Sequence, residues 1–143
     1  MSKERRLFFL MTQAQRSMVR YADAALLGQH GVTSAQAAAL MYLAKNDASP
    51  LTRLAEGLGL NAPAITGLTN RLERLGLVER RDDPDDGRAY RLTLTPEGRR
   101  RAEAIVPRVR ALQAEALRGF GPDEIDTIVR FLTSLIKRFQ ESP

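Results

Sequence analysis

Apolar side chains recur every three or four residues near both ends of the chain, the spacing that places them on one face of an α-helix. The first segment runs from residue 3 to about residue 27, where Gly28 and Gly31 are expected to break it. The last helix is expected to begin near Asp123 and to continue to the C-terminus. Its apolar positions are Ile125, Ile128, Val129, Leu132, Leu135, Ile136 and Phe139. A small domain cannot cover this much apolar surface, so the terminal helices predict association with a second chain. An intramolecular bundle is the alternative.

Two shorter helices joined by a tight turn are predicted between residues 53 and 75. Thr52 is expected to cap the first helix, and Gly59 supplies the turn. Asn61 is a favourable N-cap for the second helix, and Pro63 is tolerated in its first turn. Gly76 ends this helix, because glycine adopts the left-handed conformation most easily. The apolar face of the second helix consists of Ile65, Leu68, Leu72 and Leu75, and its polar face offers Thr66, Asn70, Arg71 and Arg74.

A two-stranded hairpin is predicted directly after these helices. Residues 77–81 are strand-like, residues 82–87 are rich in turn formers, and residues 89–94 alternate between apolar and polar positions. Arg88 is expected at the tip of the loop. Two short helices followed by a hairpin are typical of a winged helix-turn-helix, which places its second helix in the major groove of DNA.

The remaining segments are also predicted to be helical. Thr33 and Gln36 form a capping box for a helix that ends near residue 44, and residues 46–50 form a loop. Thr95 caps a further helix that runs to about residue 118, with Pro96 at its first position. The sequence therefore predicts a mainly α fold with a small β-hairpin wing, in which N- and C-terminal helices serve dimerisation.

Composition narrows the function classes. The net charge is +5, which suits a polyanionic partner, although six arginines and six acids balance between residues 71 and 91. The chain has no cysteine and one histidine, so thiol redox sensing and cysteine-ligated zinc are excluded and no metal or other cofactor is expected. No apolar run is long enough for a membrane span, and the first residues do not resemble a signal peptide. We therefore expect a cytoplasmic protein that does not bind membranes.

Three groups of residues follow one another in a recognisable order. They are Leu54-Ala55 with Leu58-Gly59-Leu60; Ile65-Thr66, Leu68, Arg71-Leu72-Glu73, Gly76-Leu77-Val78 and Arg81; and Asp86, Arg88, Leu92, Leu94-Thr95 and Gly98. Their order and spacing resemble those of the MarR family of bacterial transcription regulators. The resemblance implies a single MarR-type domain over residues 1–143, with a DNA-binding lobe at 51–95 and a helical dimerisation frame at 3–46 and 99–140. One departure is Gly67, where the family often has a longer polar side chain.

The expected function is that of a sequence-specific regulator of transcription, a repressor that binds double-stranded DNA as a homodimer. Two recognition helices roughly 34 Å apart would select a pseudo-palindromic operator. Thr66 and Asn70 are the candidates for base edges, while Ala62 and Pro63 are candidates for thymine methyl groups. Arg88 is expected in the minor groove. The other predicted DNA-binding residues are Asn61 and the phosphate-binding Arg53, Arg71 and Arg74. Arg71 has an alternative, an ion pair with Glu79 or Asp83.

The resemblance also implies a small aromatic or phenolic effector, bound between the dimerisation frame and the DNA-binding lobe, that releases the protein from DNA. Met11, Tyr21, His30 and Tyr42 are the candidate ligand-binding residues, and each has an alternative as an ordinary packing residue. The sequence does not identify the ligand.

No arrangement of residues suited to catalysis is present, so no catalytic residue is assigned and an enzyme is not expected. The alternative function is a winged-helix module that contacts another protein, or that binds DNA without sequence preference or ligand response.

Overall fold

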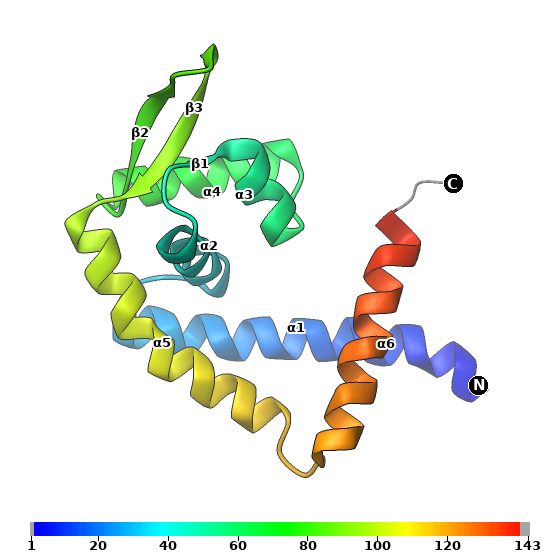
Figure 1. Cartoon of the computed structure of the whole chain (residues 1–143). Helices are drawn as coiled ribbons and strands as arrows, with labels where there is room; N and C mark the ends of the chain where they lie inside the picture. Colours follow the sequence, from blue (N-terminus) through cyan, green and yellow to red (C-terminus); the bar gives the residue numbers. More distant parts are fainter. Residues whose placement is uncertain (1, 141–143) are drawn as a thin grey trace. The chain divides into compact units, whose positions relative to one another are not determined.

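The computed structural model describes residues 2–140, without the side chains of residues 4, 5 and 88. Its helices are α1 (Lys3–His30), α2 (Ser34–Lys45), α3 (Leu51–Leu58), α4 (Ala62–Arg74), α5 (Pro96–Ala116) and α6 (Pro122–Gln140). Its strands are β1 (Ser49–Pro50), β2 (Val78–Asp83) and β3 (Asp86–Leu94) (Figure 1). The chain divides into two compact units, Met1–Arg108 and Val109–Pro143. The predicted fold class, mainly α with a β-hairpin wing, is confirmed.

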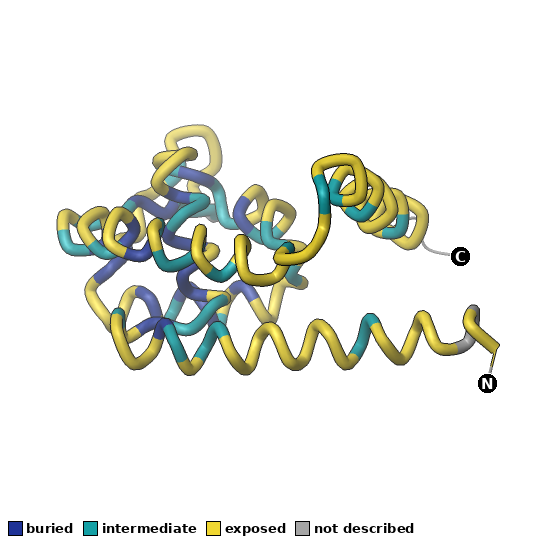
Figure 2. The backbone as a smooth tube through the Cα atoms, turned by 90° about the horizontal axis from the view of Figure 1, so that it is seen from below, coloured by how far each residue is buried: buried dark blue, intermediate teal, exposed yellow. Residues whose placement is uncertain are grey.

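The core of the first unit lies where α2, α3, α4 and the sheet meet. Leu40, Leu43, Leu54, Leu72 and Leu92 are fully buried there. The capping box of α2 is confirmed, because Thr33 Oγ1 accepts from the Gln36 amide and Gln36 Oε1 accepts from the Thr33 amide. Figure 2 shows the buried positions gathered in this region, while the helix that begins at the N mark is exposed over most of its length.

The sheet has one strand more than the sequence predicted. Its order is β1-β3-β2, and both pairs are antiparallel. Ser49 pairs with Leu92 and Pro50 with Arg91, so the expectation of a loop through residues 46–50 is wrong at its end. A strand of two residues is too short to show an alternating pattern, and its pairing with a segment more than 40 residues away leaves no local signal.

Two expected helix ends are corrected. The N-cap of α3 is Pro50, and Thr52 lies inside the helix, because the pairing of β1 with β3 holds the chain extended only as far as Pro50. Helix α1 continues through Gly28 to His30. A single glycine weakens a long helix by about 1 kcal/mol without breaking it. The break falls at Gly31, whose φ of +66° is left-handed.

The second unit contains the end of α5 and the whole of α6. None of the described residues of α6 is buried, and Val129, Leu132, Ile136 and Phe139 are exposed, Phe139 by 77%. The amino-terminal part of α1 likewise exposes Leu7, Phe8, Phe9 and Leu10. Among residues 2–140, none of the helices combines the length and apolarity that a bilayer crossing requires.

Candidate nucleic-acid interface

Helix α4 is built as the sequence predicted at both ends. Asn61 Oδ1 accepts a hydrogen bond of 2.9 Å from the Ala64 amide, and Pro63 lies in the first turn. Gly76 follows the helix with a φ of +73°. The inward face consists of Ile65, Leu68 and Leu72, all buried, together with Thr69. Leu75 was predicted on this face, but it is 50% exposed, because it is the C-cap and the chain turns at the next residue.

The outward face of α4 is open to solvent. Its first turns expose Asn61, Ala62, Pro63, Ala64 and Thr66. The candidate phosphate-binding residues Arg53, Arg71 and Arg74 are exposed as well. Apart from Asn70, the candidates on α3 and α4 are therefore accessible to a large partner.

Arg71 lies along its own helix. A Cβ atom built on Gly67 would lie 3.8 Å from Arg71 Nη2, so the guanidinium passes beside the position that lacks a side chain. Among the described side chains Arg71 forms no ion pair, and Asp83 is instead 3.4 Å from Arg91. The ion pair of Arg71 with Glu79 or Asp83, which the sequence left open, is not found among the described side chains. The charge of Arg71 is therefore not balanced by an acid among them.

The wing is the antiparallel hairpin of β2 and β3, which extends beyond α3 and α4 (Figure 1). Its turn consists of Pro84 and Asp85, whose amide donates to Asp83 Oδ1 over 2.9 Å. The ladder shifts register at Asp82 and Asp83, which pair with Tyr90 and Asp86.

Arg88 was expected at the loop tip, but its backbone lies in β3 beyond the turn. It falls within the stretch that the register shift leaves without a partner, between Asp86 and Tyr90. Its side chain lies outside the described residues, so its place in the minor groove stays a prediction.

Two arginines that sequence reasoning missed connect the wing to its surroundings. Arg80 of β2 pairs with Glu73 of α4 (Nε to Oε2, 2.8 Å) and donates to Asn70 Oδ1. Arg91 of β3 donates to the carbonyl of Ala48 over 3.1 Å. Neither set of contacts could be read from sequence spacing, because the partners lie on other elements.

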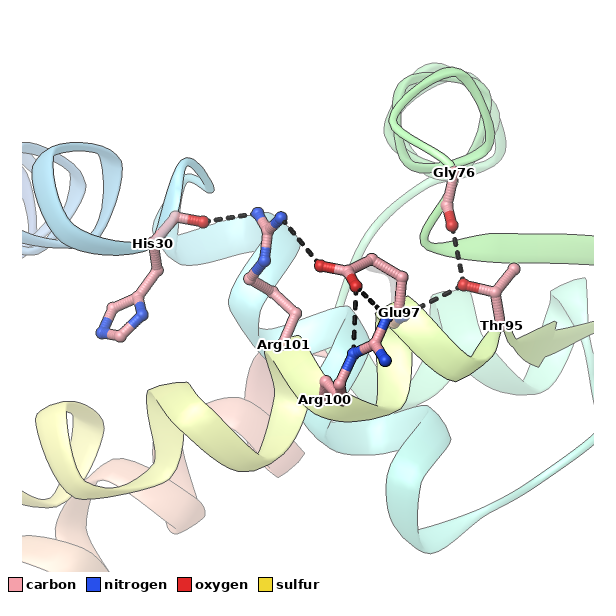
Figure 3. Close-up of polar contacts among 7 residues, drawn as sticks. His30, Gly76, Thr95, Glu97, Arg100 and Arg101 are labelled. Carbon is pink, nitrogen blue, oxygen red and sulfur yellow. Dashed lines mark hydrogen bonds and ion pairs between the residues drawn. The ribbon is translucent and has the colours of Figure 1, made fainter.

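Polar contacts at the start of α5 reach Gly76, which follows α4, and His30 at the end of α1 (Figure 3). Thr95 Oγ1 donates to the carbonyl of Gly76 (2.7 Å) and accepts from the Gly98 amide (2.9 Å), so its predicted role as a cap is confirmed. The hydrogen bond from Arg100 lowers the pKa of Glu97, and the charges of Arg100 and Arg101 add to this effect. Arg101 Nη1 in turn donates to the His30 carbonyl over 2.6 Å.

The four candidate effector residues are not gathered in one cavity. His30 lines an open pocket of about 480 Å³ at the start of α5, together with Gln29, Glu97, Arg100 and Arg101. Met11 and Tyr42 are half-buried, Tyr42 against the core, and Tyr21 is 61% exposed. The pocket at the start of α5 therefore does not support a ligand-binding role for Met11, Tyr21 or Tyr42.

Comparison with known proteins points to one family. A sequence model of the MarR family matches residues 30–89. The HTH-type transcriptional repressor YetL of Bacillus subtilis is 31% identical over 99 residues, 69% of this chain. The match spans only 59% of the length of YetL.

Solved structures agree with the sequence match. A probable transcriptional regulator of Pseudomonas aeruginosa is 32% identical, with a TM-score of 0.80 over 90% of this chain and 95% of its own. The Bordetella bronchiseptica protein BpsR, whose DNA binding is regulated by 6-hydroxynicotinic acid, is 26% identical. Its TM-score is 0.77 over 91% of this chain and 98% of its own. The names of YetL and of the Pseudomonas aeruginosa protein are those of regulators of transcription, and MarR-family proteins are not enzymes, as the sequence predicted for this chain.

Proposed function

The chain belongs to the MarR family of DNA-binding transcription regulators, and on that premise we propose that it is a repressor that binds a pseudo-palindromic operator as a homodimer. The observation that carries this proposal is the exposure of one face of α4. Its apolar side chains are buried, while Thr66, Arg71 and Arg74 face solvent beside a projecting wing. Hydrogen-bonding side chains read base edges in the major groove, and arginines bind phosphates.

The homodimer is supported by apolar surface on both terminal helices. Helix α6 exposes Val129, Leu132 and Ile136, and α1 exposes Phe8 and Phe9. Soluble proteins rarely leave such patches uncovered. A twofold dimer would repeat the recognition helix about one turn of DNA away, roughly 34 Å, and thereby select an inverted repeat. A regulator of this kind acts in the cytoplasm, where its DNA is.

The proposal includes release of the protein from DNA by a small ligand. It is supported by the similarity to BpsR, a protein regulated by an aromatic acid. A ligand of this type would bind the state that does not fit DNA more tightly than the state that does. Met11, Tyr21, His30 and Tyr42 remain the residues to test. Of these, His30 borders a pocket that also contains Arg100 and Arg101, both of which are paired with Glu97 in its lining.

Selection from a pool of random duplexes tests the proposal without knowledge of the regulated genes. The protein is incubated with the pool at near-physiological salt, and the bound duplexes are amplified and sequenced over several rounds. The expected result is an inverted repeat with half-site centres about one helical turn apart. Enrichment of a single half-site would contradict the dimer. No enrichment would contradict a sequence-specific regulator and favour a module that contacts proteins or binds DNA by charge alone.

A further inference from the structure

We propose that Arg80 is a positioning residue that fixes the wing against the recognition helix and thereby sets sequence specificity. The inference rests on the proposed function, since it concerns how the DNA-binding surface is held. Arg80 lies on β2, and its guanidinium contacts one residue of β3 and two residues of α4.

The contacts of Arg80 use different parts of one planar group. Its Nε is 2.8 Å from Glu73 Oε2, and its Nη2 donates to Asn70 Oδ1. Its Cζ lies 4.5 Å from the centre of the Tyr90 ring, at a distance typical of a cation–π contact. The hydrogen bonds point toward the helix, while the flat face rests on the wing. Only arginine offers several donors in a rigid plane that can also stack on a ring.

The helical partners of Arg80 lie on consecutive turns of α4 at the edge of its outward face. Glu73 and Asn70 are three residues apart, so their side chains lie on the same side of the helix. Asn70 is also a candidate for reading a base. Because Arg80 occupies its Oδ1, the orientation of the Asn70 amide depends on the position of the wing. A shift of the wing would therefore change both wing contacts and a base contact.

A direct phosphate contact by Arg80 is the rival explanation, and the geometry argues against it. The side chain is 39% exposed, and its charge is already opposed by Glu73 at 2.8 Å. The neighbouring Arg81 is exposed and forms no ion pair with any described side chain. Arg81 therefore provides a matched control that removes the same charge from the adjacent position.

The test uses four variants of the full chain: Arg80→Ala, Arg80→Lys, Glu73→Ala and the control Arg81→Ala. Fluorescence anisotropy gives the dissociation constants for the selected operator and for a shuffled duplex, at several salt concentrations. Arg80→Ala and Glu73→Ala should each reduce the preference for the operator by about tenfold. Arg80→Lys should not restore it, because lysine lacks the planar fork. Arg81→Ala should leave the preference unchanged.

Glu73→Ala separates the two explanations most clearly. If Arg80 held a phosphate, removal of Glu73 would free the arginine and strengthen binding to both duplexes. If Arg80 positions the wing, the same change weakens operator binding. Strengthened binding, or an unchanged preference in both Arg80→Ala and Glu73→Ala, would overturn the proposal.

Hydrogen exchange without DNA distinguishes failure of this inference from failure of the proposed function. Amides of β2 and β3 should exchange faster in Arg80→Ala and Glu73→Ala than in the wild type, and at the wild-type rate in Arg81→Ala. If the wild type shows no preference for any duplex, the proposed function is wrong. The role of Arg80 in sequence preference is then wrong too, even if the amides of β2 and β3 exchange faster in its variants. If the wild type discriminates but exchange is the same in all variants, the positioning role alone is wrong.

Discussion

Arg101 and His30 are joined by a hydrogen bond of 2.6 Å from the guanidinium Nη1 to the main-chain carbonyl. The last carbonyls of a helix have no partner within the helix, and its C-terminal end attracts a positive charge. His30 is the final residue of α1, so Arg101 supplies both the missing donor and the charge. Within the first unit, this contact ties the start of α5 to the end of α1.

Replacement of Arg101 by alanine should lower the free energy of unfolding by about 1–2 kcal/mol. The change removes a charge-assisted hydrogen bond and leaves the His30 carbonyl without its partner. Urea unfolding at fixed protein concentration measures the effect. Arg100→Ala is the control, because that side chain is 73% exposed, and it should change stability by less than ~0.5 kcal/mol. Equal effects of the two substitutions would contradict a special role for Arg101.

Low pH should reduce the contribution of Glu97 to the stability of the folded protein. The hydrogen bond from Arg100, with the charges of both arginines, holds the pKa of Glu97 below its ordinary value of 4.5. A carboxyl whose pKa is lower in the folded state adds stability above the unfolded pKa and loses it as pH falls through the folded pKa. The wild type should therefore be more stable than Glu97→Gln at pH 7, and the difference should shrink below pH 4.5. A difference that is constant between pH 7 and pH 3 would show that Glu97 acts through packing instead.

Two glycines should respond in opposite ways to alanine. A Cβ at Gly98 would lie 1.9 Å from the carbonyl oxygen of Leu77, a main-chain atom that also accepts from the Thr95 amide. Gly98→Ala must displace the start of α5 and should cost about 3 kcal/mol, the upper end for overpacking. At Gly67 the nearest atom is 3.8 Å away, so Gly67→Ala should stabilise the protein by about 1 kcal/mol through helix propensity.

Thermal or urea unfolding of each glycine variant, compared with the wild type, tests the predicted loss of stability in Gly98→Ala and the predicted gain in Gly67→Ala. A destabilised Gly67→Ala would mean that the path of Arg71 beside Gly67 matters to the fold.

A lysine on the apolar face of α6 should prevent dimerisation. Ile136 is 59% exposed in the single chain, and a charge there would have to be buried in the proposed interface. Ile136→Lys should weaken self-association by more than about tenfold, measured by sedimentation equilibrium. Ser134→Lys is the matched control on the opposite side of the helix. If both variants associate like the wild type, α6 is not part of a dimer interface.

Local signals in the sequence predicted the elements of the interface well. Asn61, Thr33 with Gln36, and Thr95 each act within a few residues of their own position, so their capping roles could be read directly. Gly76 was found in the same way, because its left-handed φ is a property of one residue. The fold class followed from these caps and from helical periodicity.

Contacts between distant segments could not be predicted from the sequence. The pairing of Ser49 with Leu92 and the bond from Arg91 to Ala48 each join residues more than 40 positions apart. The contacts of Arg80 were missed for a related reason. A charged strand residue is ordinarily solvated, and only the packing of β2 beside α4 brings Arg80 to Glu73 and Asn70.

In the proposed function, the exposed face of α4 and the wing together read a DNA sequence. Fluorescence anisotropy with the selected operator and a shuffled duplex, at low and near-physiological salt, tests it most directly. A sequence-specific regulator should bind the operator tightly even at the higher salt, and should bind the shuffled duplex more weakly by at least about 10³-fold. Equal binding to both duplexes that falls steeply with salt would contradict it, because charge alone would then explain the interaction.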